Sequence, residues 1–124
     1  MIVDDDRIVL RACERLLRGL GEIVVCSGGL KALDEIRRGG VALLVSDVNM
    51  PEMTGIELLR TVRESDRSLP VILVTGVPNR EDETAARDLD VFGYLTKPFV
   101  RDELRSIVRR ALGQNAAPSD RPGR

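Results

Sequence analysis

Histidine is absent from this sequence, and cysteine is scarce. Without histidine the chain cannot build a His-ligated zinc site, a Ser-His or Cys-His nucleophile system, or a phosphohistidine of its own. The two cysteines, Cys13 and Cys26, form no C-x-x-C motif, and we interpret them as small apolar core residues. Chemistry on this chain must therefore rest on carboxylates, hydroxyls and lysine.

Aromatic residues are also rare: they make up 2% of the sequence, and tryptophan is absent. A chain of 124 residues is the usual size of one domain, so its core must be aliphatic. The net charge of −1, with both signs mixed, favours neither nucleic acid nor an anionic membrane as a partner. No apolar run has the length of a membrane span and no signal-peptide pattern opens the chain, so we expect a soluble, cytoplasmic protein.

Short apolar runs alternate with helical patterns along the chain. The runs are rich in Val, Ile and Leu without strict alternation, which is typical of strands that are covered on both faces. We predict five strands, at Met1–Val3, Ile23–Cys26, Ala42–Ser46, Val71–Thr75 and Gly93–Thr96. Apolar residues at helical spacing follow them in the ranges 8–20, 30–36, 58–62, 80–90 and 104–112. This repeat predicts an α/β fold, a doubly wound parallel sheet with right-handed crossovers and helices on both faces.

The last helical pattern is followed by Gly113, and residues 114–124 lack any periodicity. We therefore predict one domain over residues 1–113 and a flexible tail or linker over residues 114–124. The first strand is very short, which is compatible with a loss of residues before Met1.

Polar residues stand where the predicted strands end. They are Asp4, Asp5 and Asp6 after the first strand, Asp47 after the third, Thr75 at the end of the fourth and Lys97 after the fifth. In an open parallel sheet, ligands bind outside the carboxyl ends of the strands. We therefore expect these side chains to converge on one rim of the sheet.

The chemistry of such a cluster is specific. Crowded carboxylates repel one another and resist ionisation unless they share a cation. A hard divalent ion, Mg²⁺ or Mn²⁺, suits two or three carboxylates, a backbone carbonyl and water. A carboxylate beside that ion and a lysine can attack a phosphoryl group and form an acyl phosphate, because this transfer depends on positioning and charge neutralisation. The residues thus favour phosphoryl chemistry, with Lys97 and the Thr75 hydroxyl facing the transferred charge.

Each of these residues also has a purely structural interpretation. Asp6 fits the N-cap of a helix that begins near Arg7, and Asp47 alone would fit an Asx-turn. Thr75 alone would be a hydroxyl at a strand end, and Lys97 alone a solvated surface residue. Only two of the 19 basic residues are lysine, which indicates that a compact ammonium is needed at position 97. The combination at successive strand ends is more specific than any single residue.

The motifs VDDD, VSDVNMPEMTG, VILVTG and YLTKPF resemble those of the receiver domain of two-component response regulators, the CheY-like family. The resemblance implies a flavodoxin-like (βα)5 fold with the strand order 2-1-3-4-5. It implies a signalling module and not an enzyme that acts on other substrates, since a receiver catalyses only its own phosphorylation and dephosphorylation. The implied partners are a sensor histidine kinase or phosphotransfer protein and a downstream effector domain or protein.

The resemblance also implies a role for each residue of the rim. Asp47 matches the phosphoacceptor, and Thr75 and Lys97 match the hydroxyl and the lysine that act with it. The implied metal ligands are Asp4, Asp5, Asp47 and the backbone carbonyl of Asn49. Thr75 and Tyr94 match the switch residues of the family. The peptide bond between Lys97 and Pro98 is expected to be cis.

Some positions depart from the family pattern or tune it. Thr54 stands where many relatives have Asp, and with Glu57 it predicts a capping box at the start of a helix. Asp90 stands where Gly is usual, and Asp tolerates a positive φ better than most residues do. Val77 and Asn49 occupy positions that influence how water reaches the acyl phosphate. Because Val77 is apolar and cannot orient a water, we expect that hydrolysis is not especially fast.

The implied signalling surface comprises the helix over residues 80–90, the strand Gly93–Thr96 that carries Tyr94, and the last helix. The helix over residues 80–90 has the poorest apolar stripe in the chain, so it is the easiest to shift. A homodimer through this surface is one expectation, in which acidic and basic residues pair across a two-fold axis. The residues concerned are Glu81, Asp82, Glu83, Arg101, Arg105 and Arg109. An ordinary solvated charged face explains the same pattern equally well.

Other functions fit the sequence less well. A phosphatase of the haloacid-dehalogenase type also uses a strand-end Asp and Mg²⁺, but it needs a second Asp as general acid where this chain has Asn49. The chain also lacks room for the usual cap of such a phosphatase. A degenerate receiver that only docks to partners is disfavoured by the complete set of rim residues. The nucleotide-binding motifs G-x-G-x-x-G and G-x-x-x-x-G-K-[ST] are absent.

Overall fold

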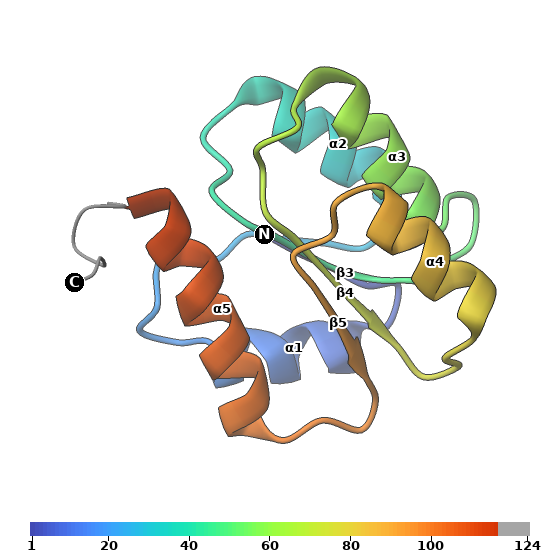
Figure 1. Cartoon of the computed structure of the whole chain (residues 1–124). Helices are drawn as coiled ribbons and strands as arrows, with labels where there is room; N and C mark the ends of the chain where they lie inside the picture. The colour runs from blue at the N-terminus through green and yellow to red at the C-terminus, as the bar shows by residue number, and fades with distance from the viewer. Residues whose placement is uncertain (117–124) are drawn as a thin grey trace.

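The computed structural model describes residues 1–116 and contains a parallel sheet of five strands in the order β2-β1-β3-β4-β5 (Figure 1). The strands are β1 (Ile2–Val3), β2 (Val25–Cys26), β3 (Leu44–Asp47), β4 (Val71–Thr75) and β5 (Gly93–Thr96). The helices are α1 (Arg7–Leu16), α2 (Gly29–Arg38), α3 (Gly55–Ser65), α4 (Arg80–Asp88) and α5 (Arg101–Ala116). The predicted α/β class, the five-fold β-α repeat and the flavodoxin-like strand order are confirmed.

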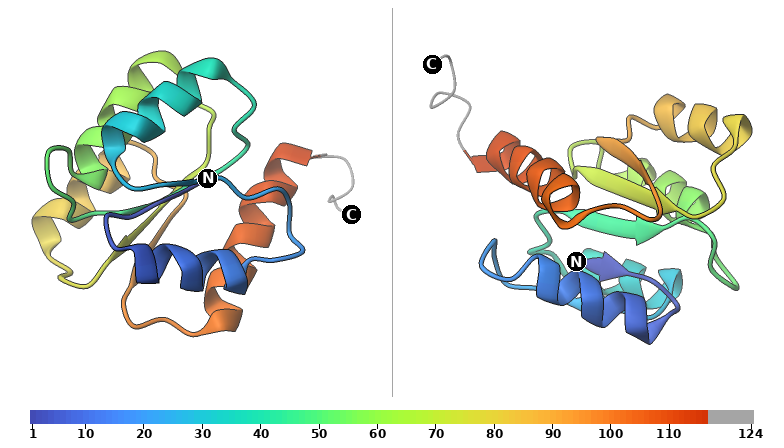
Figure 2. Two further views of the ribbon diagram at one scale, coloured as in Figure 1. Left: turned by 180° about the vertical axis from the view of Figure 1, so that it is seen from behind. Right: turned by 90° about the horizontal axis from the view of Figure 1, so that it is seen from below.

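The helices cover both faces of the sheet. Helices α2, α3 and α4 pack on one face, where the core contains Leu58 and Leu73. Helices α1 and α5 pack on the other face, where the core contains Leu104 and Ile72, and the left view of Figure 2 shows the same separation from behind. Every residue of β3 and β4 is buried. Burial on both faces explains why these strands are continuous apolar runs in the sequence.

Two helix starts carry the caps that the sequence predicts. Oδ1 of Asp6 accepts a hydrogen bond from the Ile8 amide at 2.9 Å, at the N-cap of α1. Thr54 and Glu57 form the predicted capping box of α3, with reciprocal hydrogen bonds of 3.1 and 2.8 Å. Each bond pairs an amide that the first helical turn leaves without a partner. These residues therefore fix where α1 and α3 begin.

Helix α1 is shorter than predicted. It ends at Leu16, whereas the apolar pattern continues to Leu20. Gly19 adopts a left-handed φ of 92°, which the helix cannot contain. The guanidinium of Arg105 on α5 also donates hydrogen bonds to the carbonyls of Leu16 and Arg18, at 2.8 and 3.1 Å. A tertiary contact therefore replaces the hydrogen bonds that a longer helix would have made.

Further boundaries differ from the prediction, since β1 begins at Ile2 and β3 runs over Leu44–Asp47 instead of Ala42–Ser46. Helix α5 continues through Gly113 to Ala116, because one glycine weakens a helix by only about 1 kcal/mol. Strand β2 is shorter than predicted, because its neighbour β1 pairs with Val25 and Cys26 alone. The domain boundary at residue 113 stays a prediction, and residues 117–124 of the expected tail lie outside the described residues. No helix within residues 1–116 is long and apolar enough to cross a membrane.

Candidate functional site

Residues at the carboxyl ends of four strands meet at one rim of the sheet. Asp4 follows β1, and Asp47 is the last residue of β3. Thr75 is the last residue of β4, and Lys97 follows β5. These strands are parallel and lie side by side in the order β1-β3-β4-β5, so the chain leaves them at the same edge. The structure thus brings together the residues that the strand ends predicted.

Asp4 is a buried carboxylate with a partner on each oxygen. Oδ1 accepts a hydrogen bond from the Asp6 amide at 2.9 Å, and Oδ2 lies 3.4 Å from Nζ of Lys97. Only 4% of the residue is exposed. Burial raises the pKa of Asp4 above its usual value, although the Asp6 amide and Lys97 both favour the charged form. The charge of Lys97 therefore does not fully offset the cost of burying ionised Asp4, and a further cation beside it would stabilise the charged form.

Asp47 shares the same lysine. Its Oδ1 lies 3.2 Å from Nζ of Lys97, and 8% of the residue is exposed. Burial and then repulsion from Asp4 raise the pKa of Asp47 above its usual value. Burial alone would lower the pKa of Lys97, but the two carboxylates outweigh it and raise that pKa. One protonated lysine thus serves two crowded carboxylates.

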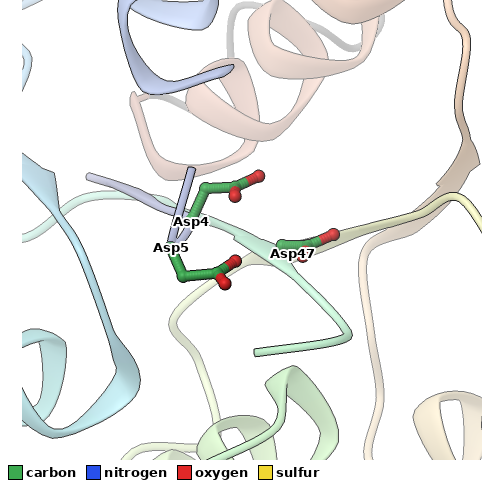
Figure 3. A group of neighbouring side chains, drawn as sticks. All are labelled: Asp4, Asp5 and Asp47. Atoms are coloured by element: carbon green, nitrogen blue, oxygen red, sulfur yellow. The ribbon is translucent and has the colours of Figure 1, made fainter. Parts of the chain in front are cut away.

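Asp5 completes an acidic cluster with Asp4 and Asp47. One carboxylate oxygen of each residue lies within 4.8 Å of the other two, and Asp5 is the exposed member. Figure 3 shows the three carboxylates projecting to the same side of the strand ends. Oxygen ligands that are partly open to solvent suit Mg²⁺, which binds through a few carboxylates and keeps several waters. The cluster therefore fits a divalent metal site.

The hydroxyl of Thr75 accepts hydrogen bonds from the connection after β3 and from the connection after β4. Thr75 is fully buried, and its Oγ1 accepts a hydrogen bond from the Val77 amide at 3.0 Å. The side-chain amide of Asn49 donates to the same oxygen at 3.4 Å. From the sequence we expected the Asn49 carbonyl to bind the metal and this position to influence water access, but we did not foresee the contact of its side chain with Thr75. No local pattern signals it, because Asn49 lies in the connection after β3, whereas Thr75 ends β4.

The loop after Asp47 comes very close to the strand end. Gly55 begins α3, and its amide donates to the Val48 carbonyl at 2.7 Å. A Cβ atom at position 55 would collide with the carbonyl oxygen of Asp47. The same carbonyl accepts a hydrogen bond of 2.9 Å from Oγ of Ser46. Glycine at position 55 therefore permits the backbone arrangement that presents Asp47.

Tyr94 lies on β5, two residues before the end of that strand. Its ring is partly buried against the core on the α2–α4 face. Its hydroxyl is buried and has no hydrogen-bond partner among the described residues. The expected cis peptide between Lys97 and Pro98 is confirmed, and Asp90 adopts a positive φ of 57°, which an aspartate tolerates.

One basic residue of the expected dimer surface is engaged within the chain. Arg105 donates to the carbonyls of Leu16 and Arg18 at the end of α1. It is therefore turned toward α1 and is not free to pair with acidic residues of a second copy. Arg101 and Arg109 are exposed, so a dimer through this surface stays a prediction that rests on them.

Comparisons with known proteins agree with this geometry. Residues 1–109 match the family model of the response regulator receiver domain. The chemotaxis protein CheY of Pseudomonas aeruginosa is 39% identical over 114 residues, which cover 89% of this chain and 92% of that protein. The uncharacterized transcriptional regulatory protein YkoG of Bacillus subtilis is 33% identical over 121 residues, and the chain spans only 53% of its length.

A solved structure shows the same fold. The crystal structure of a response regulator receiver domain protein (CheY-like) from Methanospirillum hungatei JF-1 has a TM-score of 0.86 and 25% identity, with 91% of each chain covered. The acidic cluster of Asp4, Asp5 and Asp47 at the strand ends is consistent with a phosphate-accepting switch. The family match over nearly the whole chain, the fold and this cluster together show that the chain belongs to the response regulator receiver (CheY-like) family.

Proposed function

We propose that this receiver domain is a phosphorylation-controlled switch whose phosphoacceptor is Asp47. The observation that carries the proposal is the contact of 3.2 Å between Oδ1 of Asp47 and Nζ of Lys97, in a buried group that includes Asp4. A receiver domain implies a histidine kinase as partner. The kinase or a phosphotransfer protein supplies the phosphoryl group from a phosphohistidine, which this chain cannot form because it has no histidine.

Asp47 acts as the nucleophile in this transfer. One of its carboxylate oxygens forms a bond to phosphorus while the bond between phosphorus and the donor histidine breaks. The imidazole keeps the electron pair of that bond. Lys97 stays protonated and faces the negative charge on the phosphoryl oxygens, where a fixed cation in a buried site stabilises the transition state. The domain catalyses this phosphorylation and the later dephosphorylation of itself.

The metal ligands that we propose are Asp4, Asp5, Asp47 and the backbone carbonyl of Asn49, for Mg²⁺ or Mn²⁺. When bound, the cation supplies positive charge that offsets the charge of the phosphoryl oxygens. The chain prepares the ligands by its own contacts. The Asp6 amide orients Asp4, and Lys97 holds both Asp4 and Asp47 on one side.

Thr75 and Tyr94 are the switch residues of this proposal. A phosphoryl group on Asp47 adds strong acceptor oxygens near the buried Thr75 hydroxyl. The hydroxyl then exchanges its contacts with Asn49 and Val77 for a bond to a phosphoryl oxygen, and the connection between β4 and α4 follows it. Because Ala86 is the one buried residue of α4, that helix is easy to shift. The face formed by α4, β5 and α5, which includes Tyr94, then changes and controls an effector domain or protein.

Incubation with acetyl phosphate and Mg²⁺, followed by intact mass measurement, tests the proposal. The wild-type chain is expected to gain the mass of one phosphoryl group, and chelation of the metal is expected to abolish the gain. Asp47→Asn removes the nucleophile but keeps the shape of the side chain, so it is expected to gain nothing. An equal gain on both chains, or none on the wild type, would contradict the assignment.

A further inference from the structure

Arg63 on α3 is a buried charged residue that the proposed phosphoryl chemistry does not use. Only 5% of it is exposed. Its guanidinium donates hydrogen bonds to the carbonyls of Leu89 at 2.8 Å, Asp90 at 3.0 Å and Asp66 at 3.1 Å. The first two carbonyls belong to the turn between α4 and β5, and the third belongs to the connection between α3 and β4. One side chain thus ties the C-terminal end of α4 to α3.

The residues that Arg63 contacts after α4 form the C-terminal cap of that helix. Asp90 has the positive φ of 57° that such a cap requires. Its amide donates to the Arg87 carbonyl at 3.0 Å. The next amide, of Val91, donates to the Ala86 carbonyl at 3.1 Å. These two hydrogen bonds form the Schellman pattern of a helix C-terminus. The carbonyls of Leu89 and Asp90 at this end carry negative partial charge, which attracts the Arg63 guanidinium. The planar guanidinium can donate to several such acceptors at once.

The opposite end of α4 is held more loosely. Residues 76–81, which follow the buried Thr75, are all exposed. The cap of α4 is local, since Oδ1 of Asn79 accepts from the Asp82 amide at 2.8 Å. The buried residue of α4, Ala86, lies in the C-terminal half. Helix α4 therefore has one fixed end at the Arg63 contacts and one loose end that continues from Thr75.

We propose that Arg63 is a positioning residue that makes the C-terminal end of α4 a pivot, so that phosphorylation moves the N-terminal end alone. The inference rests on the proposed function, because it concerns how a signal from Asp47 reaches α4. A loose end beside Thr75 receives the change, and the Arg63 contacts keep the other end in register with α3. The movement is then a rotation of α4 about its fixed end and not a displacement of the whole helix.

Hydrogen exchange measured by mass spectrometry, with and without phosphorylation by acetyl phosphate and Mg²⁺, tests this proposal. In the wild-type chain, phosphorylation is expected to change exchange in residues 76–84 and to leave residues 86–91 unchanged. In Arg63→Met, residues 86–91 are expected to exchange roughly tenfold faster without phosphorylation, because hydrogen bonds from a charged group are lost. Phosphorylation is then expected to change exchange along all of α4.

Arg67→Met is the matched control. Arg67 is exposed and makes an ion pair of 3.4 Å with the Asp90 side chain, so it touches the same turn without holding its backbone. This variant is expected to show the wild-type pattern. Arg63→Lys, which keeps the charge but loses the fork, is expected to fall between the wild type and Arg63→Met. If Arg63→Met does not fold, the exchange of residues 86–91 in Arg63→Lys tests the proposal instead.

The outcomes separate this inference from the proposed function. If intact mass shows no phosphoryl group on the wild-type chain, the proposed function fails, whereas the exchange of unphosphorylated Arg63 variants still reports the fixed end. If the phosphorylated wild type changes equally at residues 76–84 and 86–91, the pivot is contradicted. Wild-type protection of residues 86–91 in Arg63→Lys and in folded Arg63→Met would also overturn it.

Discussion

Lys97 Nζ lies 3.2 Å from Oδ1 of Asp47, although strand β4 lies between β3, which ends in Asp47, and β5, which Lys97 follows. The lysine reaches across the end of β4 to a carboxylate on β3. It also lies 3.4 Å from Oδ2 of Asp4, beyond the end of β1. The ammonium group of Lys97 therefore contacts carboxylates from two other strand ends, and it supplies the positive charge that balances them.

Asp47→Asn is expected to raise the free energy of unfolding in the absence of Mg²⁺, by about 1 kcal/mol. The raised pKa of Asp47 means that burial and repulsion from Asp4 disfavour its charged form in the folded chain. Asparagine keeps the shape and removes that charge, and Lys97 still pairs with Asp4. Urea unfolding measures the change. Asp34→Asn on the exposed face of α2 is the control, and a less stable Asp47→Asn chain would contradict the account.

Mg²⁺ is expected to raise the melting temperature of the wild-type chain, because a ligand that binds only the folded state stabilises it. Asp5 is the exposed member of the acidic cluster. Asp5→Asn is therefore expected to fold normally and to show a clearly smaller rise at the same Mg²⁺ concentration. Thermal unfolding over a Mg²⁺ series provides the measurement. An identical rise in both chains would mean that Asp5 is not a ligand.

Gly55→Ala is expected to lower the free energy of unfolding by about 2 kcal/mol, because the new Cβ would collide with the Asp47 carbonyl oxygen and force the backbone to shift. The same shift is expected to slow phosphorylation, since it moves Asp47. Gly113→Ala is a suitable control, because nothing lies within 4 Å of a Cβ at that position. Denaturant unfolding and the rate of phosphoryl gain are the measurements. Equal stability of the two variants would rule out the collision.

Asp66 is expected to make stability depend on pH. The Ser68 amide, followed by the Ser68 hydroxyl, lowers the pKa of Asp66 in the folded chain, each through a hydrogen bond of 2.8 Å. A lowered pKa means that the ionised form stabilises the fold above the unfolded pKa, and that this contribution disappears as the pH falls through the folded pKa. Asp66→Asn should therefore be less stable than wild type at neutral pH, and the difference should shrink below about pH 4. A difference that stays constant with pH would refute this role.

Val77→Glu is expected to shorten the lifetime of the phosphorylated state. Val77 is 65% exposed, and its amide donates to the Thr75 hydroxyl beside Asp47. A valine side chain cannot orient a water for attack on the acyl phosphate, whereas a carboxylate can accept a hydrogen bond from that water. The decay of the phosphorylated mass after removal of acetyl phosphate gives the rate. Slower decay in Val77→Glu than in wild type would count against this explanation.

Much of the fold and of the rim could be predicted from the sequence, because local patterns carry that information. Strand ends are marked by a change from apolar to polar residues, which placed Asp47 and Thr75 at the ends of β3 and β4. Caps are local as well, and the Thr54–Glu57 capping box depends on two residues of one helical turn. The parallel order of the strands then brings the predicted ends together.

Contacts between distant segments could not be predicted in this way. The Asn49 amide meets the Thr75 hydroxyl, and Arg63 meets the Leu89 carbonyl, through side chains whose partners have no fixed spacing in the sequence. The end of α1 shows the same limit. Its apolar pattern continues past Leu16, but Arg105 from α5 caps the helix there.

Identification of the residue that carries the phosphoryl group decides whether Asp47 is the phosphoacceptor. Borohydride reduces an aspartyl phosphate to homoserine, so reduction after phosphorylation with acetyl phosphate and Mg²⁺ leaves a permanent mark at the acceptor. Peptide mass mapping then locates the mark. We expect homoserine at position 47 and at no other aspartate, with no mark when Mg²⁺ is chelated. Homoserine at Asp4 or Asp5, or a phosphorylated chain with no homoserine at position 47, would contradict that expectation.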